Sequence, residues 1–170
     1  MKNLYMVTLG GKVKGCNIEV HDVQFVVADH IDETVELLKS IWYGLDEKLH
    51  MDSYKAITGA DGFKVSLTEK KPDHSRQLFF VHFGGYKKEC TQELHDIGLY
   101  AGESLQEVRE RALKEAKAAD IENHVDSVIP VETVMLSSDG MKYYIDLSMS
   151  HEYFDPAPDW FGYRRLDHQE

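Results

Sequence analysis

The sequence is poor in cysteine, in basic residues and in long apolar runs, and each shortage excludes a class of protein. Lysine and arginine number 19 against 30 acidic residues, so the net charge is −11 and the surface would repel a polyanion such as nucleic acid. With 2 cysteines, we expect free thiols in a reducing compartment. No run approaches the roughly 18 apolar residues of a membrane helix. We therefore expect no nucleic-acid partner and no membrane partner.

The first apolar run is too short for a secretion signal. It covers residues 4–9, whereas such a signal needs about 7 to 15 apolar residues. A similar run, LFFVHF, recurs at residues 78–83, where no signal peptide can lie. Both runs are typical of strands, and we expect a cytoplasmic protein. With 42% hydrophobic residues, the acidic chain is predicted to be soluble and globular, with one core or two small ones.

The chain contains an internal duplication. A shift of 74 positions places residues 4–57 on 78–131 without a gap, and 15 of the 54 aligned positions are identical, where composition alone would give roughly 3. The identities gather in two clusters. The first contains Gly10/Gly84, Gly11/Gly85, Lys14/Lys88, Cys16/Cys90, Glu19/Glu93, His21/His95 and Asp22/Asp96, and the second contains His50/His124, Asp52/Asp126 and Ser53/Ser127.

Both copies predict the same order of elements. An apolar strand leads to an alternating strand at 23–27 or 97–101, then a helix, then two closing strands. In the second copy Ser104 and Glu107 form a capping box for the helix, and in the first copy Asp29 or Asp32 could cap it. The first copy closes with strands at about 51–58 and 63–68, joined by an Asp-Gly turn.

The predicted fold is therefore α+β, with two tandem β-β-α-β-β repeats. This is the element order of ubiquitin-like rolls, and a ferredoxin-like arrangement is the alternative. The repeats span residues 1–67 and 78–148, with a polar linker at 68–77. Because a unit of this size is marginal alone, we expect the copies to pack as an intramolecular pseudo-dimer.

The tail at residues 149–170 has no counterpart in the repeat. Pro156 and Pro158 argue against a regular element there, while its aromatic residues are too apolar for a solvated end. We expect this tail to pack on the core, and a partner or homo-oligomer contact is the alternative.

The motif Gly-Gly-x4-Cys-x2-Glu-x-His-Asp, followed by a strand, a helix and His-x-Asp-Ser, resembles the family of domain of unknown function 1543. The resemblance covers nearly everything up to about Leu147. It implies one or two copies of such a domain, and it implies no activity. Function must therefore be argued from the residues themselves.

The glycine pairs, Gly10-Gly11 and Gly84-Gly85, favour a turn that needs positive φ. The alternative is an anion-binding nest supported by the lysines that follow, Lys12 and Lys14 or Lys87 and Lys88, with a small anionic ligand.

The cysteines have two interpretations of their own. Cys16 and Cys90 could be nucleophiles, each with a histidine five positions later. Otherwise they are simply small buried residues.

A metal site is the most specific hypothesis. If the two turns meet, Cys16, His21, Cys90 and His95 would supply a tetrahedral Cys2His2 set, with Asp22 and Asp96 orienting the imidazoles. The alternative is that the His-Asp pairs bond the backbone of their own turns. Retention in both copies slightly favours this structural role, because each copy must fold whereas only one needs to act.

The sequence thus favours a non-enzymatic module that binds a small ligand or a protein and needs no cofactor. The alternative is a small enzyme or metal-binding protein that uses the duplicated segments. Any site should lie at Gly10, Gly11, Cys16, Glu19, His21 and Asp22, or at Gly84, Gly85, Cys90, Glu93, His95 and Asp96.

Overall fold

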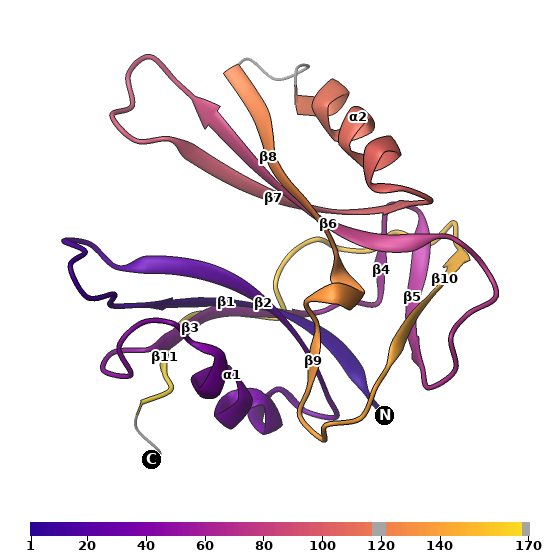
Figure 1. Cartoon of the computed structure of the whole chain (residues 1–170), viewed down its shortest axis with the longest axis horizontal. Helices are drawn as coiled ribbons and strands as arrows, with labels where there is room; N and C mark the ends of the chain where they lie inside the picture. The colour runs from indigo at the N-terminus through magenta and orange to yellow at the C-terminus, as the bar shows by residue number, and fades with distance from the viewer. Residues whose placement is uncertain (117–121, 168–170) are drawn as a thin grey trace. The chain divides into compact units, whose positions relative to one another are not determined.

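The computed structural model describes residues 1–116 and 122–167 and divides the chain into two compact units (Figure 1). Unit 1 consists of Met1–Thr58, Met135–Tyr143 and Phe154–Glu170, and unit 2 consists of Gly59–Val134 and Tyr144–Tyr153. Each unit therefore combines residues of both predicted repeats. Residues 117–121 of the second repeat and 168–170 of the tail lie outside the described residues.

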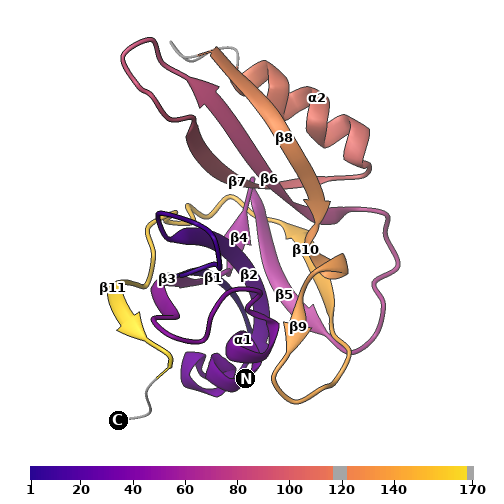
Figure 2. The same cartoon turned by 60° about the vertical axis from the view of Figure 1, so that its left-hand side comes forward.

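Unit 1 is built on a five-stranded sheet with the order β11-β3-β1-β2-β9. The central strand β1 (Asn3–Gly11) pairs antiparallel with β2 (Val20–Ala28) and with β3 (His50–Ala56). At the edges, β9 (Leu136–Ser137) runs parallel to β2, and β11 (Trp160–Arg165) runs antiparallel to β3. Both edge strands come from late in the chain (Figure 2).

One face of this sheet is covered by a short helical segment, η1 (Ile31–Thr34) followed by α1 (Val35–Ile41) (Figure 1). The alternating side chains Tyr5, Val7 and Leu9 of β1 form a core with Leu38 and Trp42 from the helix and its end. Even-numbered residues of β1 consequently lie on the face of the sheet opposite α1.

Unit 2 contains two three-stranded sheets, β7-β6-β8 and β10-β5-β4. In the first, β6 (Gln77–Tyr86) pairs antiparallel with both β7 (Leu94–Gly102) and β8 (Glu122–Pro130). Helix α2 (Leu105–Ala116) packs Val108 and Ala112 on Phe79 and Val81 of β6. The second sheet joins β4 (Gly59–Ala60), β5 (Phe63–Thr68) and β10 (Tyr144–Met149), and η2 (Val131–Thr133) follows β8.

The fold is α+β as predicted, and residues 1–116 and 122–167 form mostly strands with two short α-helices and several sheets. The Ser104 half of the predicted capping box forms at α2, where Ser104 Oγ accepts the Glu107 N–H at 3.2 Å. The Glu107 carboxylate accepts the N–H of Glu103 at 2.7 Å, one residue before the expected partner. At the first helix no side chain caps the N-terminus. Asp29 instead pairs with Lys2 and the N-terminal amine.

Two local predictions need correction. The predicted Asp61-Gly62 turn forms, with both residues at positive φ, but it joins β5 to the short β4 and not to β3. The tail forms the regular strand β11 after its prolines, because its backbone completes the exposed edge of β3. Leu166, directly after this strand, is 2% exposed and belongs to the core of unit 1.

Candidate functional site

The register of unit 1 places one glycine between two histidines. Gly10 of β1 pairs with His21 of β2 on one side and with His50 of β3 on the other. A Cβ atom at Gly10 would lie 2.5 Å from Nε2 of His50 and 2.9 Å from Nε2 of His21. Only glycine therefore lets both imidazoles lean over the strand, on the sheet face opposite α1.

Two carboxylates join these imidazoles. Nε2 of His21 lies 3.1 Å from Asp52 Oδ2 and 3.7 Å from Glu19 Oε1. Nε2 of His50 lies 3.3 Å from Asp52 Oδ1 and 3.9 Å from Glu19 Oε2. The donor atoms of Glu19, His21 and His50 all lie within 4.8 Å of one another, which makes this cluster a candidate metal centre.

His50 is held in one orientation. Its ring is 1% exposed, and its Nδ1 lies 2.7 Å from the carbonyl oxygen of Lys48. A carbonyl can only accept, so Nδ1 carries a proton and Nε2 faces the carboxylates, where its lone pair would be available to a metal ion in the neutral ring. Lys48 has φ of 68°, an uncommon value for a residue with a side chain. A histidine fixed through its second nitrogen is the usual arrangement of a metal ligand.

Asp52 reaches the cluster through a β-bulge. The β1–β3 register shifts between Thr8 and Leu9, and Asp52 is the residue left without a partner. Period-2 alternation places Asp52 on the same face as His50, and the bulge turns its carboxylate toward both imidazoles.

Unit 2 repeats this construction at the equivalent positions. Gly84 pairs with His95 and His124, and a bulge between His82 and Phe83 leaves Asp126 unpaired. Nε2 of His124 lies 2.8 Å from Asp126 Oδ1 and 3.1 Å from Glu93 Oε1. A Cβ atom at Gly84 would lie 2.5 Å from both Glu93 Oε1 and His124 Nε2.

The His-carboxylate cluster of unit 2 contains a histidine, His82, that has no equivalent in the cluster of unit 1. Nδ1 of His82 lies 3.2 Å from Asp126 Oδ2, and the His82 ring stacks on His95 with centroids 4.9 Å apart. His82, His95 and Asp126 thus form a second donor group that shares Asp126 with Glu93 and His124.

An aromatic ring lies against the equivalent histidine in each unit. Tyr163 of β11 stacks on His50 with ring centroids 4.2 Å apart, and Tyr86 of β6 stacks on His124 at 5.7 Å. A hydrogen bond to Glu93 raises the pKa of Tyr86. The two tyrosines occupy non-equivalent sequence positions, since Lys12 stands where the second copy has Tyr86.

The clusters are electrostatically unbalanced. Among the described residues, Glu19, Asp52, Glu93 and Asp126 lie within 4 Å of histidine ring nitrogens and form no ion pair with lysine or arginine. With the imidazoles neutral, as metal ligation requires, the two carboxylates leave each cluster about two negative charges, which a divalent cation would balance.

The predicted role of the glycine pairs needs correction. The pairs lie inside β1 and β6, and the described glycines with positive φ are Gly15, Gly62, Gly140 and Gly162. What Gly10 and Gly84 provide is space, and Gly11 likewise leaves room for Trp42, 2.9 Å from a Cβ built there. Gly85 is buried and pairs with Leu94. Anion binding by Lys12, Lys14, Lys87 and Lys88, all exposed, stays a prediction.

The cysteines, and the aspartates Asp22 and Asp96, belong to none of the donor groups found among the described residues. Cys16 and Cys90 are free and exposed, so the expectation of buried thiols is wrong. The donor groups found among the described residues contain neither cysteine. Asp22 and Asp96 accept the N–H of the following residue at 2.9 and 2.8 Å. The Cys2His2 site, which would combine residues of both units, stays a prediction.

The site residues missed from the sequence are His50, Asp52, His82, His124 and Asp126. Four of these belong to the second cluster of identities, and that cluster was the available signal. The sequence did not predict that the second cluster of identities lies beside the first, because the order of the strands in the sheet could not be derived from it. His82 has no counterpart in the first copy and carries no signal of duplication.

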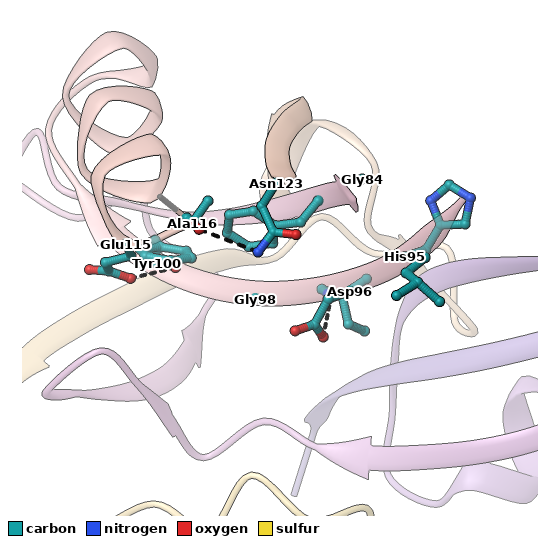
Figure 3. Close-up of a pocket in the computed structure, with 11 residues that line it drawn as sticks. Gly84, His95, Asp96, Gly98, Tyr100, Glu115, Ala116 and Asn123 are labelled. Carbon is teal, nitrogen blue, oxygen red and sulfur yellow. Dashed lines mark hydrogen bonds between the residues drawn. The ribbon is translucent and has the colours of Figure 1, made fainter. Parts of the chain in front are cut away.

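A pocket of about 460 Å³ borders the His-carboxylate cluster of unit 2 (Figure 3). Gly84 and His95 line one end of it, and Tyr100 and Glu115 lie at the other. The Tyr100 hydroxyl donates to Glu115 at 2.7 Å, and burial followed by this bond raises the pKa of Tyr100 well above its usual value.

Comparison with known proteins finds a family model that matches part of the chain and a similar solved structure. Residues 16–67 match the family model described as Domain of Unknown Function (DUF1543), which confirms the resemblance over that range. The crystal structure of a protein Il1583 from Idiomarina loihiensis is similar, with a TM-score of 0.70 and 26% identity over 98% of this chain and 99% of that one. No curated protein matches the chain. Across residues 1–116 and 122–167, no helix is long and apolar enough to cross a membrane.

Proposed function

We propose that this protein binds divalent transition-metal ions, with a His-carboxylate centre in each unit. The observation that carries the proposal is that the same residue types stand at equivalent positions in both units, with Glu19, His21, His50 and Asp52 answered by Glu93, His95, His124 and Asp126. In unit 1 Asp52 contacts both histidines of the Glu19, His21 and His50 group, and in unit 2 Asp126 belongs to one group with Glu93 and His124 and to another with His82 and His95. In both units a glycine between the histidines makes the space that the set needs.

The spacing of the donors supports a metal. Ligands about 2.05 Å from a tetrahedral ion lie about 3.3 Å apart. The four histidine-carboxylate distances in unit 1 run from 3.1 to 3.9 Å. These exceed the roughly 2.7–2.9 Å of a charge-assisted hydrogen bond. In unit 2 the 2.8 Å contact of His124 with Asp126 is a normal hydrogen bond, so that cluster must open slightly around an ion.

The donor types narrow the choice of ion. Imidazole nitrogen favours zinc, copper, iron and nickel over calcium or magnesium, and carboxylates are compatible with zinc, iron and manganese. Zn²⁺ is the best-matched probe. This function develops the metal-binding alternative, with carboxylates in place of the cysteines. A binding role without catalysis remains the simpler form of the proposal.

The tandem-repeat pseudo-dimer also belongs to this proposal. It is supported by the shared order of pairing, since β1 pairs with β2 and β3 just as β6 pairs with β7 and β8. A cytoplasmic location, a small anionic ligand and homo-oligomer formation stay predictions from the sequence.

The test is zinc binding by the full chain, purified without a metal-affinity tag and stripped with a chelator. Calorimetric titration should show bound Zn²⁺, and His21→Ala should remove the unit 1 ion. His21 is 48% exposed, so its loss should leave the fold intact. His30→Ala is the matched control, because His30 belongs to none of the donor groups. Absence of zinc binding at micromolar concentrations would overturn the proposal.

A further inference from the structure

We infer that the two centres differ in nuclearity, with unit 2 holding two ions bridged by Asp126 and unit 1 holding one. This inference rests on the proposed function. Its basis is the extra histidine of unit 2: among the described residues, unit 2 has two donor groups where unit 1 has one.

Asp126 presents one oxygen to each donor group. Its Oδ1 lies 2.8 Å from Nε2 of His124, in the group completed by Glu93. Its Oδ2 lies 3.2 Å from Nδ1 of His82, in the group completed by His95. A carboxylate that directs its two oxygens at two separate donor sets is the bridging arrangement of two-metal sites, whose ions lie about 3.5–4 Å apart.

The donors of both groups can be reached from solvent. The side chains of His82 and Asp126 are each 31% exposed, His124 is 41% exposed, and His95 is exposed. Two ions can therefore enter without unfolding of the sheet. Their charge would offset the carboxylates of Glu93 and Asp126.

Thr8 stands where unit 2 has His82, so the described residues of unit 1 contain no counterpart of the His82 group. Within the described part of unit 1, Asp52 directs both oxygens at the single set, with Oδ1 toward His50 and Oδ2 toward His21. Both imidazoles converge on the same carboxylates, which suits one ion. A single difference on the central strand thus separates a mononuclear centre from a dinuclear one.

The experiment counts zinc ions in the stripped full chain by native mass spectrometry and calorimetry. The inference predicts one ion for each of the three donor groups found in the described part of the chain. His82→Thr, which installs the residue of the first copy, should lose one ion. His74→Thr is the matched control, because His74 also contacts a carboxylate, Asp146 at 3.0 Å, outside the clusters. Loading with Mn²⁺ should give a spin-coupled EPR signal that His82→Thr abolishes.

The outcomes separate this inference from the proposed function. Three ions in the wild type with a coupled Mn²⁺ pair support both. One or two ions, with no coupling, overturn the bridged pair and leave metal binding intact. No bound ion overturns both. If His82→Thr fails to fold, as circular dichroism would show, the coupling in the wild-type protein still decides the question.

Discussion

A Cβ atom placed on Gly10 would lie 2.5 Å from Nε2 of His50. The space around this glycine is thus occupied by the atom that we propose as a metal ligand. The same distance recurs between Gly84 and Nε2 of His124. In both copies, therefore, the glycine is needed because the histidine side chain occupies the space next to it.

Gly10→Ala is expected to weaken zinc binding in unit 1. The methyl group would push His50 away from Glu19 and Asp52, with an affinity loss of about 10- to 100-fold and a destabilisation of about 1–3 kcal/mol. Zinc titration and urea unfolding measure the two effects. Gly98→Ala is the control, since a Cβ there meets the edge of Tyr100 at 2.8 Å, outside both clusters. Unchanged zinc affinity in Gly10→Ala would contradict the role of His50.

Tyr163→Ala should loosen the unit 1 centre. The ring stacks on His50 at 4.2 Å, and its removal should cost about 0.5–1.5 kcal/mol of stability. It should also speed zinc release from unit 1, measured by stopped-flow exchange with a chelator. Phe161→Ala, on the same strand and 77% exposed, is the matched control and should change neither quantity.

Both cysteines should react with a thiol reagent in the native protein. Cys16 and Cys90 are exposed and stand outside the donor groups, so zinc should not protect them. Cys→Ser in either copy should change the free energy of unfolding by less than about 0.5 kcal/mol. Protection of both thiols by zinc would instead favour the Cys2His2 site.

Asp139 should stabilise unit 1 at neutral pH and lose this effect in acid. Hydrogen bonds from Ser137 and from the Met141 N–H, and then Lys2, hold the pKa of Asp139 well below its usual value. A depressed folded pKa gives stability that is present above the unfolded pKa of about 3.9 and is lost as the pH falls through the folded value. Urea unfolding should therefore show Asp139→Asn to be destabilised at pH 7, with a gap to wild type that narrows below about pH 4. Asp73→Asn, an exposed residue of the linker, should show no such gap.

A fragment ending at Lys71 should not fold as a monomer. It keeps β1, β2 and β3 but loses β9, β11 and the core residue Leu166, so both edges of the unit 1 sheet become unpaired. Circular dichroism and sedimentation should show an unfolded chain, an aggregate, or a homodimer that mimics the pairing of the two copies. A monomer that melts cooperatively near the temperature of the full chain would contradict this expectation.

The sequence by itself determined the class of fold, the family resemblance and part of the site. Alternation and apolar spacing predict strands and helices because local geometry sets their periods, and the duplication marks Glu19 and His21 beside Glu93 and His95. The capping box at Ser104 and the turn at Asp61 were predictable for the same local reason.

Only the tertiary structure decided which distant residues meet. His50 joins His21 because β1 lies between β2 and β3, and strand order depends on long-range packing that no local pattern encodes. The tertiary structure likewise showed that Gly10 leaves room for the histidines and that the cysteines are exposed. It also showed that β9 and β11 complete the sheet of unit 1. The sequence shows which residues can bind a metal ion, whereas only the fold shows that they meet on one face of a sheet.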